Sequence, residues 1–234
     1  MVASRSTTLL INLAHDELRW RPVGGPLQRI RGFGICGPQL APFEIDTAQQ
    51  RFIMGIVFHA TGAANLLDVP AHEFASAHVS LEMLLGSGAA DLNEKLAEAP
   101  SALHRFAITE SWLLDRLARR CTPLGPTSHA IALLDHMSVA QVRERLGVTS
   151  RRLIRGFRVE HGLAPKQYGR LRRFERLLNA IDGRSTADWA ALAAWHGYYD
   201  QAHLVHEFRA FSGFAPSEYL ARRGDFATHV PLAD

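Results

Sequence analysis

Arginine dominates the chemistry available to the second part of this chain. Of the 234 residues, those from Ser138 to Arg223 include 15 arginines and lysines against 8 aspartates and glutamates, a net charge of +7. The remaining residues carry 11 basic against 15 acidic side chains, a net charge of −4. This asymmetry indicates a polyanionic partner for the positive segment. A solvated basic surface without a partner would carry the same charge, so the interpretation depends on a motif.

The cysteines and histidines give little indication of a disulfide or metal site. Cys36 and Cys121 are far apart and lie in no paired motif, which argues against a disulfide framework and a thiolate zinc site. His203 and His206 have a spacing of i, i+3, but a third metal ligand is not apparent. The other candidate histidines are dispersed in the first half of the chain: His59, His72, His78 and His104. We expect no metal and no other cofactor.

The basic segment contains an internal repeat with an offset of about fifty residues. The first copy consists of Gly147, Leu153, Phe157, Arg158, Gly162, Ala164, Pro165 and Tyr168. The second copy consists of Gly197, Leu204, Phe208, Arg209, Gly213, Ala215, Pro216 and Tyr219, with one extra residue after its first glycine. Eight identities at one offset indicate two copies of one structural unit.

Each copy has the start and stop signals of two helices joined by a tight turn. Ser138 with Gln141 forms a capping-box pattern, and Asp188 stands at the equivalent N-cap of the second copy. Gly147 and Gly197 end the first helices where a positive φ is required. The second helices are predicted to begin at the caps Thr149 and Asp200 and to end at Gly162 and Gly213. The two helix-turn-helix units therefore occupy about 138–162 and 188–213.

Residues 165 to about 181 are predicted to form one helix that joins the two units. Its apolar stripe consists of Tyr168, Leu171, Phe174, Leu178 and Ile181, and Asp182-Gly183 terminates it. Arg170, Arg173 and Arg176 line another side at three-residue spacing. Such a row is usually a solvated helix face, but its place between two basic units favours contact with DNA.

The second copy resembles the signature of the AraC/XylS family of transcription regulators. The resemblance rests on Ala193, Gly197, Tyr198, Asp200, Gln201, Leu204, Phe208, Arg209, Gly213, Phe214, Ala215, Pro216 and Tyr219. It covers about Ser128 to Arg223 and implies an all-α domain, residues 126–224, of two homeodomain-like units joined by a long helix. In that family the two recognition helices enter successive major-groove segments on one face of the duplex. The implied partner is double-stranded DNA.

The resemblance also implies which side chains face the DNA. On the first recognition helix these are Arg151, Arg152, Ile154 and Arg155, with Arg158 nearer the phosphates. Arginine pairs bidentately with guanine, so we predict Arg151 and Arg155 to read bases. Ile154 departs from the polar residue often found there and would touch a thymine methyl group or pack. On the second helix the positions are Gln201, Ala202, Val205 and His206, followed by Arg209, with Gln201 suited to adenine. Arg173 on the joining helix is predicted to contact phosphate.

Residues 1–122 are predicted to form a mixed α+β domain. Thr7–Leu13 and Arg51–Ala60 have the pattern of strands, whereas Gly62–Leu67, Ala89–Ala97 and Ala102–Arg119 have that of helices. The motifs Gly37-Pro38-Gln39, Gly55–Phe58 and Ala63–Ala71 resemble the poorly characterised N-terminal domain of some AraC-type regulators. That resemblance implies sensing or dimerisation. Related chains have further strands before the position where this one starts, so either this is a short variant or its first strands were lost, and an enclosed ligand pocket is in doubt.

The chain as a whole is interpreted as a multidomain α+β, cytoplasmic, sequence-specific transcription regulator that is not an enzyme. No apolar run is long enough to cross a membrane, and no signal peptide is evident. The family implies a small-molecule effector of unknown identity, a homodimer and, for an activator, RNA polymerase as a partner. One alternative is a DNA-binding accessory protein without an effector. The other is a methyl-accepting alkylation-repair protein, which two isolated cysteines make less favoured.

Overall fold

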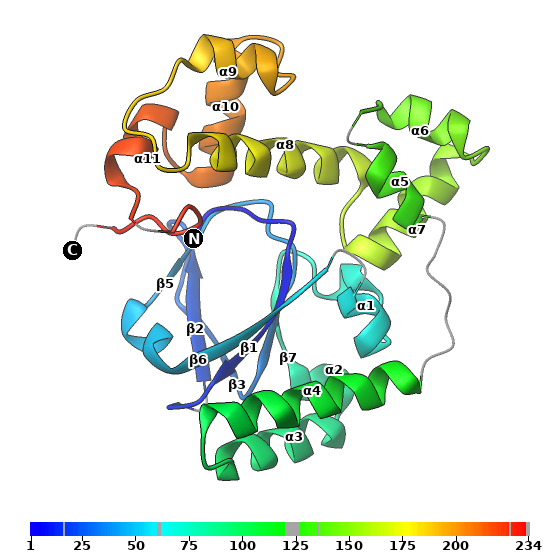
Figure 1. Ribbon diagram of the computed structural model, residues 1–234, viewed down its shortest axis with the longest axis vertical. Helices are drawn as coiled ribbons and strands as arrows, with labels where there is room; N and C mark the ends of the chain where they lie inside the picture. The colour runs from blue at the N-terminus through cyan, green and yellow to red at the C-terminus, as the bar shows by residue number, and fades with distance from the viewer. Residues whose placement is uncertain (16, 60–61, 120–126, 135, 225, 233–234) are drawn as a thin grey trace.

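The structure is a computed structural model that describes all residues except 16, 60–61, 120–126, 135, 225 and 233–234 (Figure 1). Its buried apolar side chains form two clusters. One lies within residues 9–96, and the other joins Val2 and Ala3 to residues 130–219. The predicted multidomain α+β fold is confirmed. Cys121 and the boundary expected near residue 122 lie outside the described residues.

The N-terminal domain has two antiparallel sheets, and the first cluster lies between one of them and a layer of helices. One sheet has the strand order β6-β1-β4-β7, formed by Ile53–Phe58, Thr7–Asn12, Gly34–Cys36 and His78–Ser80. The other has the order β3-β2-β5, formed by Gln28–Arg31, Glu17–Pro22 and Phe43–Ile45. The sheets touch closely, because Trp20 of β2 stacks on His78 of β7 with ring centroids 4.3 Å apart.

Helices close the lower end of this domain in Figure 1 and one side of it. They are α1 (Gly62–Leu67), α2 (Leu81–Leu85), α3 (Ser87–Glu98) and α4 (Ala102–Ala118), with the short 3-10 helices η1 (Thr47–Phe52) and η2 (Ala71–Glu73). The predicted helices and the first strand are confirmed to within two residues at each end. The prediction of strand at Arg51 and Phe52 is wrong, because Asp46 caps η1 by accepting a hydrogen bond from the Ala48 N–H.

The C-terminal part consists of helices in the predicted order. They are α5 (Thr127–Leu133), α6 (Val139–Arg145), α7 (Ser150–His161), α8 (Pro165–Ile181), α9 (Trp189–Trp195), α10 (Gln201–Ser212) and α11 (Pro216–Arg222). α8 runs across the upper part of Figure 1 and carries one helix-turn-helix unit at each end. Its predicted apolar stripe is buried.

The first residues of the chain tie the two parts together. Val2 and Ala3 are buried in the C-terminal core, where the Ala3 N–H donates to the Phe211 carbonyl at 2.8 Å. Arg5 forms an ion pair with Glu175 of α8 and donates to the Tyr168 hydroxyl at 2.6 Å. Each domain therefore contributes to the burial of the other.

The described residues contain neither a group of three or more His, Cys, Asp or Glu side chains arranged to hold a metal ion nor a helix long and apolar enough to span a membrane. His78 has an evident structural role between Trp20 and Phe43. Burial lowers the pKa of His78 to about 4, so the ring is neutral at physiological pH. Burial likewise raises the pKa of the free Cys36 thiol to about 11, which disfavours the reactive thiolate.

Candidate DNA-binding surface

The first helix-turn-helix unit is built by local signals and closed by a small apolar core. Ser138 and Gln141 form a complete capping box at the start of α6, and Gly147 takes a φ of 62° in the turn. Thr149 caps α7 by accepting from the Arg152 N–H at 3.2 Å. Val142, Leu153 and Phe157 are buried between the helices, so the opposite side of α7 must face outward.

That outward side of α7 is strongly basic. Arg151, Arg152, Arg155 and Arg158 are all exposed, and Ile154 beside them is 39% exposed. Across the described residues, the structure gives these four guanidinium groups no ion pair and no hydrogen bond. Their charge is therefore available to an external anion or acceptor, as a DNA-reading helix requires.

The second unit has the same construction and a less charged surface. Asp188 caps α9, and Asp200 caps α10 by accepting from the His203 N–H at 2.7 Å. Gly197 and Gly213 take φ angles of 73° and 84°. Five positions of α10 were predicted to face DNA: Gln201, Ala202, His206 and Arg209 are exposed, and Val205 is half-buried.

An ion pair and aromatic packing hold α10 against α8. The Arg170 guanidinium donates to both oxygens of Glu207 at 2.8 and 2.7 Å. The Glu207 side chain is only 7% exposed. Phe174 of α8 contacts the rings of Phe208 and Phe211, with centroids 5.2 and 5.3 Å away. Arg170 thus positions the second recognition helix.

Arg173 also has an internal partner. Its guanidinium donates to the Gly197 carbonyl at 2.6 Å and lies over the Tyr198 ring, 4.9 Å from the centroid. The predicted arginine row is therefore not a simple solvated face, since two of its three members connect α8 to the second unit. Contact of Arg173 with phosphate stays a prediction.

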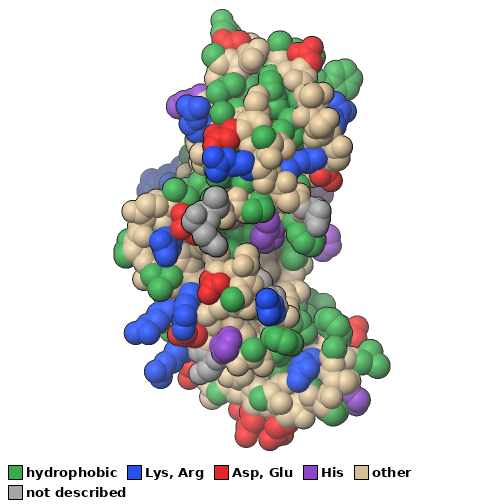
Figure 2. All heavy atoms as spheres, turned by 90° about the vertical axis from the view of Figure 1, so that its left-hand side faces the viewer, with side chains coloured by type: hydrophobic (Ala, Val, Ile, Leu, Met, Phe, Trp, Pro, Cys, Tyr) green, Lys and Arg blue, Asp and Glu red, His purple; other side chains and the backbone are tan. Residues whose placement is uncertain are grey.

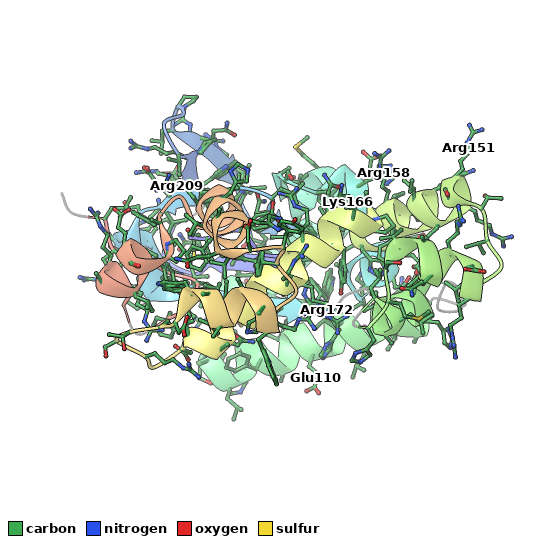
Figure 3. All side chains as sticks on the ribbon, turned by 90° about the horizontal axis from the view of Figure 1, so that it is seen from above. Glu110, Arg151, Arg158, Lys166, Arg172 and Arg209 are labelled. Atoms are coloured by element: carbon green, nitrogen blue, oxygen red, sulfur yellow. The ribbon has the colours of Figure 1, made fainter. Side chains whose placement is uncertain are left out.

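The basic side chains of the two recognition helices lie on the same side of the domain. In Figure 3, Arg151 and Arg158 of α7, Lys166 of α8 and Arg209 of α10 lie toward one side, whereas Arg172 lies toward the other. Arg172 donates to the Ile131 carbonyl at 2.8 Å and so serves the interior of the domain.

Sequence reasoning missed three exposed side chains on the two units and on α8. Lys166 lies near the start of α8, and Trp195 and Tyr199, which are 87% and 92% exposed, flank the turn before α10. Aromatic residues are normally interpreted as core. Only the repeat could have indicated otherwise, because Trp195 corresponds to the charged Arg145 of the first unit, and Tyr199 is the extra residue before the cap Asp200.

Two helix-turn-helix units with outward basic recognition helices on one side define a DNA-binding domain. Residues 142–222 match the family model described as a helix-turn-helix domain, and they form an AraC-type DNA-binding domain. No curated protein matches the sequence.

Solved structures of ToxT from Vibrio cholerae have a similar fold over both domains. One ToxT structure aligns with a TM-score of 0.50 and 11% identity over 94% of this chain and 91% of that chain. An apo structure of a single-site ToxT variant from strain SCE256 aligns with a TM-score of 0.49 and 10% identity over 94% and 90%. At 11% identity the first of these alignments shows the fold alone, an N-terminal β-rich domain followed by a helical domain.

Proposed function

We propose that this chain is a sequence-specific transcription regulator that reads two adjacent major-groove segments with α7 and α10. The position of both helices on one side of the domain, with the arginines of α7 unpaired, carries the proposal. The 17 residues of α8 span about 25 Å between the units. Two units so joined suit groove segments one helical turn, about 34 Å, apart.

The exposed side chains divide into base readers and phosphate contacts. Arg151 and Arg155 pair with guanine and Gln201 with adenine, whereas Arg158 and Arg209, which lie nearer the C-terminal ends of the two helices, bind phosphate. The remaining outward residues of the two helices shape the contact with the groove: Arg152, Ile154, Ala202, Val205 and His206. Because α10 presents fewer charges, the first unit supplies more of the base discrimination.

Replacing Arg155 by alanine is expected to weaken binding to the preferred duplex by about 1 to 3 kcal/mol and to relax its sequence preference. The preferred duplex is first selected from random DNA, and affinities are then measured for it and for singly altered sites. Arg173→Ala should instead weaken all duplexes similarly. Arg145→Ala, an exposed arginine on α6, serves as the control. An unchanged base preference in Arg155→Ala would remove Arg155 from the reading residues.

We further propose that the chain forms a homodimer through α4. The outward side of this helix carries an apolar stripe in which Leu103, Phe106, Leu114 and Leu117 are 55% to 76% exposed. Glu110 stands in the middle of the stripe and points away from the molecule (Figure 3). The stripe is symmetric about Glu110 in the sequence. Leu103 and Leu117 lie seven residues before and after it, and Phe106 and Leu114 lie four residues before and after it. An antiparallel pair of α4 helices would therefore bury matching apolar residues and bring the two Glu110 side chains together.

Substitution of Glu110 tests the antiparallel pairing of the two α4 helices. Glu110→Gln is expected to lower the dimer dissociation constant tenfold or more, because it removes a like-charge contact at the two-fold axis. A mixture of Glu110→Lys with the unaltered chain should favour the heterodimer. Leu114→Asp is the disruptive control. Sedimentation showing a monomer at all concentrations, or a dimer indifferent to Glu110, would contradict the proposed interface.

A further inference from the structure

The outer face of the β2–β3 hairpin concentrates arginine in an otherwise acidic domain. Arg19 and Arg21 of β2 and Arg29 and Arg31 of β3 are all exposed. Leu18 and Trp20, which alternate with the β2 arginines, are buried. Since side chains on one strand alternate between faces, the four arginines share the face that points away from the other sheet.

The charge on this face is only partly neutralised. Arg19 is paired with Glu17, and Arg21 lies 3.4 Å from Glu44 of β5. Arg29 is directly opposite Arg19 in the strand register, an arrangement in which like charges destabilise the pair. The structure gives Arg29 and Arg31 no ion pair or hydrogen bond with any described residue, so an external anion would relieve the repulsion.

The hairpin is fixed next to the second recognition helix. Val23, in its turn, lines a small apolar cavity of about 230 Å³ together with Phe43 of β5 and Ser212, Gly213 and Phe214 at the end of α10. A Cβ atom at Gly213 would lie 3.5 Å from Pro42. The two surfaces are thus in close proximity, and the hairpin has little freedom to turn away from α10.

The hairpin also projects toward the DNA-binding side. In Figure 3 its blue strands extend past α10 on the side where Arg151, Arg158 and Arg209 lie, opposite to Glu110 of α4. Figure 2 shows basic side chains gathered along the left edge of the molecule, at the level of the sheets and below the C-terminal helices. A duplex lying across α7 and α10 would have this second basic surface beneath it.

We infer that the outer face of the β2–β3 hairpin binds the phosphate backbone of the DNA that flanks the segment read by α10. The inference rests on the proposed function for the location of the duplex. The hairpin arginines contribute affinity without base preference, because they reach phosphates and no groove edge. A single chain would thereby cover more DNA than its two helix-turn-helix units do.

The test compares Arg29→Gln/Arg31→Gln with the unaltered chain on a duplex of about 20 base pairs and on one extended to about 40. Each phosphate contact contributes about 0.9 to the slope of log affinity against log salt. On the long duplex, the unaltered chain should lose up to about tenfold more affinity than the double variant between 50 and 200 mM salt. On the short duplex the two should differ less.

Two further variants separate local contact from general charge. Lys95→Gln/Arg119→Gln removes the same charge from the groove between α3 and α4 and should leave the salt slope unchanged. Arg29→Lys/Arg31→Lys keeps the charge and should retain the slope. Circular dichroism confirms that each variant is folded. Equal salt slopes for the unaltered chain and Arg29→Gln/Arg31→Gln would overturn the inference. So would an equal reduction of the slope in Arg29→Gln/Arg31→Gln and Lys95→Gln/Arg119→Gln.

The same measurements distinguish this inference from the proposed function. A chain that binds every duplex equally, yet loses salt dependence in Arg29→Gln/Arg31→Gln, supports the hairpin contact and contradicts sequence-specific reading. Sequence-specific binding with an unchanged salt slope in Arg29→Gln/Arg31→Gln supports the proposed function and contradicts the hairpin contact. Binding to vesicles containing phosphatidylserine is measured for the same proteins. If Arg29→Gln/Arg31→Gln lost vesicle binding but was unchanged on DNA, the hairpin would be assigned to a lipid surface and the inference overturned.

Discussion

Replacing Gly37 by alanine is expected to destabilise the N-terminal domain by about 3 kcal/mol or more. A Cβ atom at this position would lie 1.8 Å from the Phe74 carbonyl oxygen and 2.6 Å from its carbonyl carbon. Gly37 also donates to the Ala77 carbonyl, and its own carbonyl accepts from the Gln39 side chain at 3.2 Å. The backbone must therefore move, and these hydrogen bonds would weaken.

Urea denaturation followed by tryptophan fluorescence would measure this effect. The matched control is Gly55→Ala in the same domain, since an added Cβ there meets its nearest neighbours at 3.8 and 3.9 Å. That variant should differ from the unaltered chain by less than about 0.5 kcal/mol. A similar small effect for Gly37→Ala would show that the contact with Phe74 is not as close as the structure has it.

Arg170→Met is expected to destabilise the C-terminal domain by about 2 to 4 kcal/mol, because it leaves the buried Glu207 carboxylate without its partner. Arg170 itself is 35% exposed, so solvent screening keeps the effect below that of a fully buried pair. The variant also removes the contact of Arg170 with the Phe211 ring. Loosening α10 should weaken DNA binding through the second unit more than through the first.

The effect of Arg170→Met depends on pH in a defined direction. Burial acts to raise the pKa of Glu207, but the hydrogen bonds from Arg170 and the nearby positive charges, chiefly that of Arg170, together outweigh it and hold that pKa below its ordinary value of 4.5. The stability from this pair is therefore present above about pH 4.5 and is lost as the pH falls through the lowered pKa. In Arg170→Met the carboxyl can protonate, so the difference in stability should shrink below pH 4.5.

A double variant provides the control for this prediction. Arg170→Met/Glu207→Leu removes both charges and should recover most of the lost stability, because no buried charge remains unpaired. Thermal denaturation of both variants at pH 7 and pH 4 tests the expectation. A single variant as stable as the unaltered chain at pH 7 would show that Phe174, Phe208 and Phe211 suffice to hold α10.

The helix-turn-helix pair could be predicted from sequence because its signals are local. Ser138, Thr149, Asp188 and Asp200 cap helices by bonding to backbone N–H groups two or three residues further along the chain. Gly162 and Gly213 end helices in the left-handed conformation that a glycine tolerates. These signals depend on nearest neighbours in the chain, so they can be interpreted without knowing what packs on the helices.

Most of the N-terminal sheets could not be predicted in the same way. Strands such as β4 and β5 have only three residues, too few for a period of two to be evident. Each is stabilised by a strand distant in sequence, as β4 is by β1 and β7. The expected strand at Arg51 failed for a different reason, because the Asp46 cap is a local signal that begins η1, which runs through Phe52.

The sequence by itself determined the repeat, the caps and the buried faces, and with them the type of DNA-binding domain. Only the tertiary structure decided which arginines are free. In the sequence, Arg170 and Arg173 of α8 look like the arginines of α7, since both sets are spaced along a helix. In the structure, however, Arg170 is bound to Glu207 and Arg173 to the Gly197 carbonyl. It also placed the turn of the β2–β3 hairpin beside the end of α10. Both outcomes depend on partners far away in the chain, which packing alone brings within hydrogen-bonding or electrostatic range.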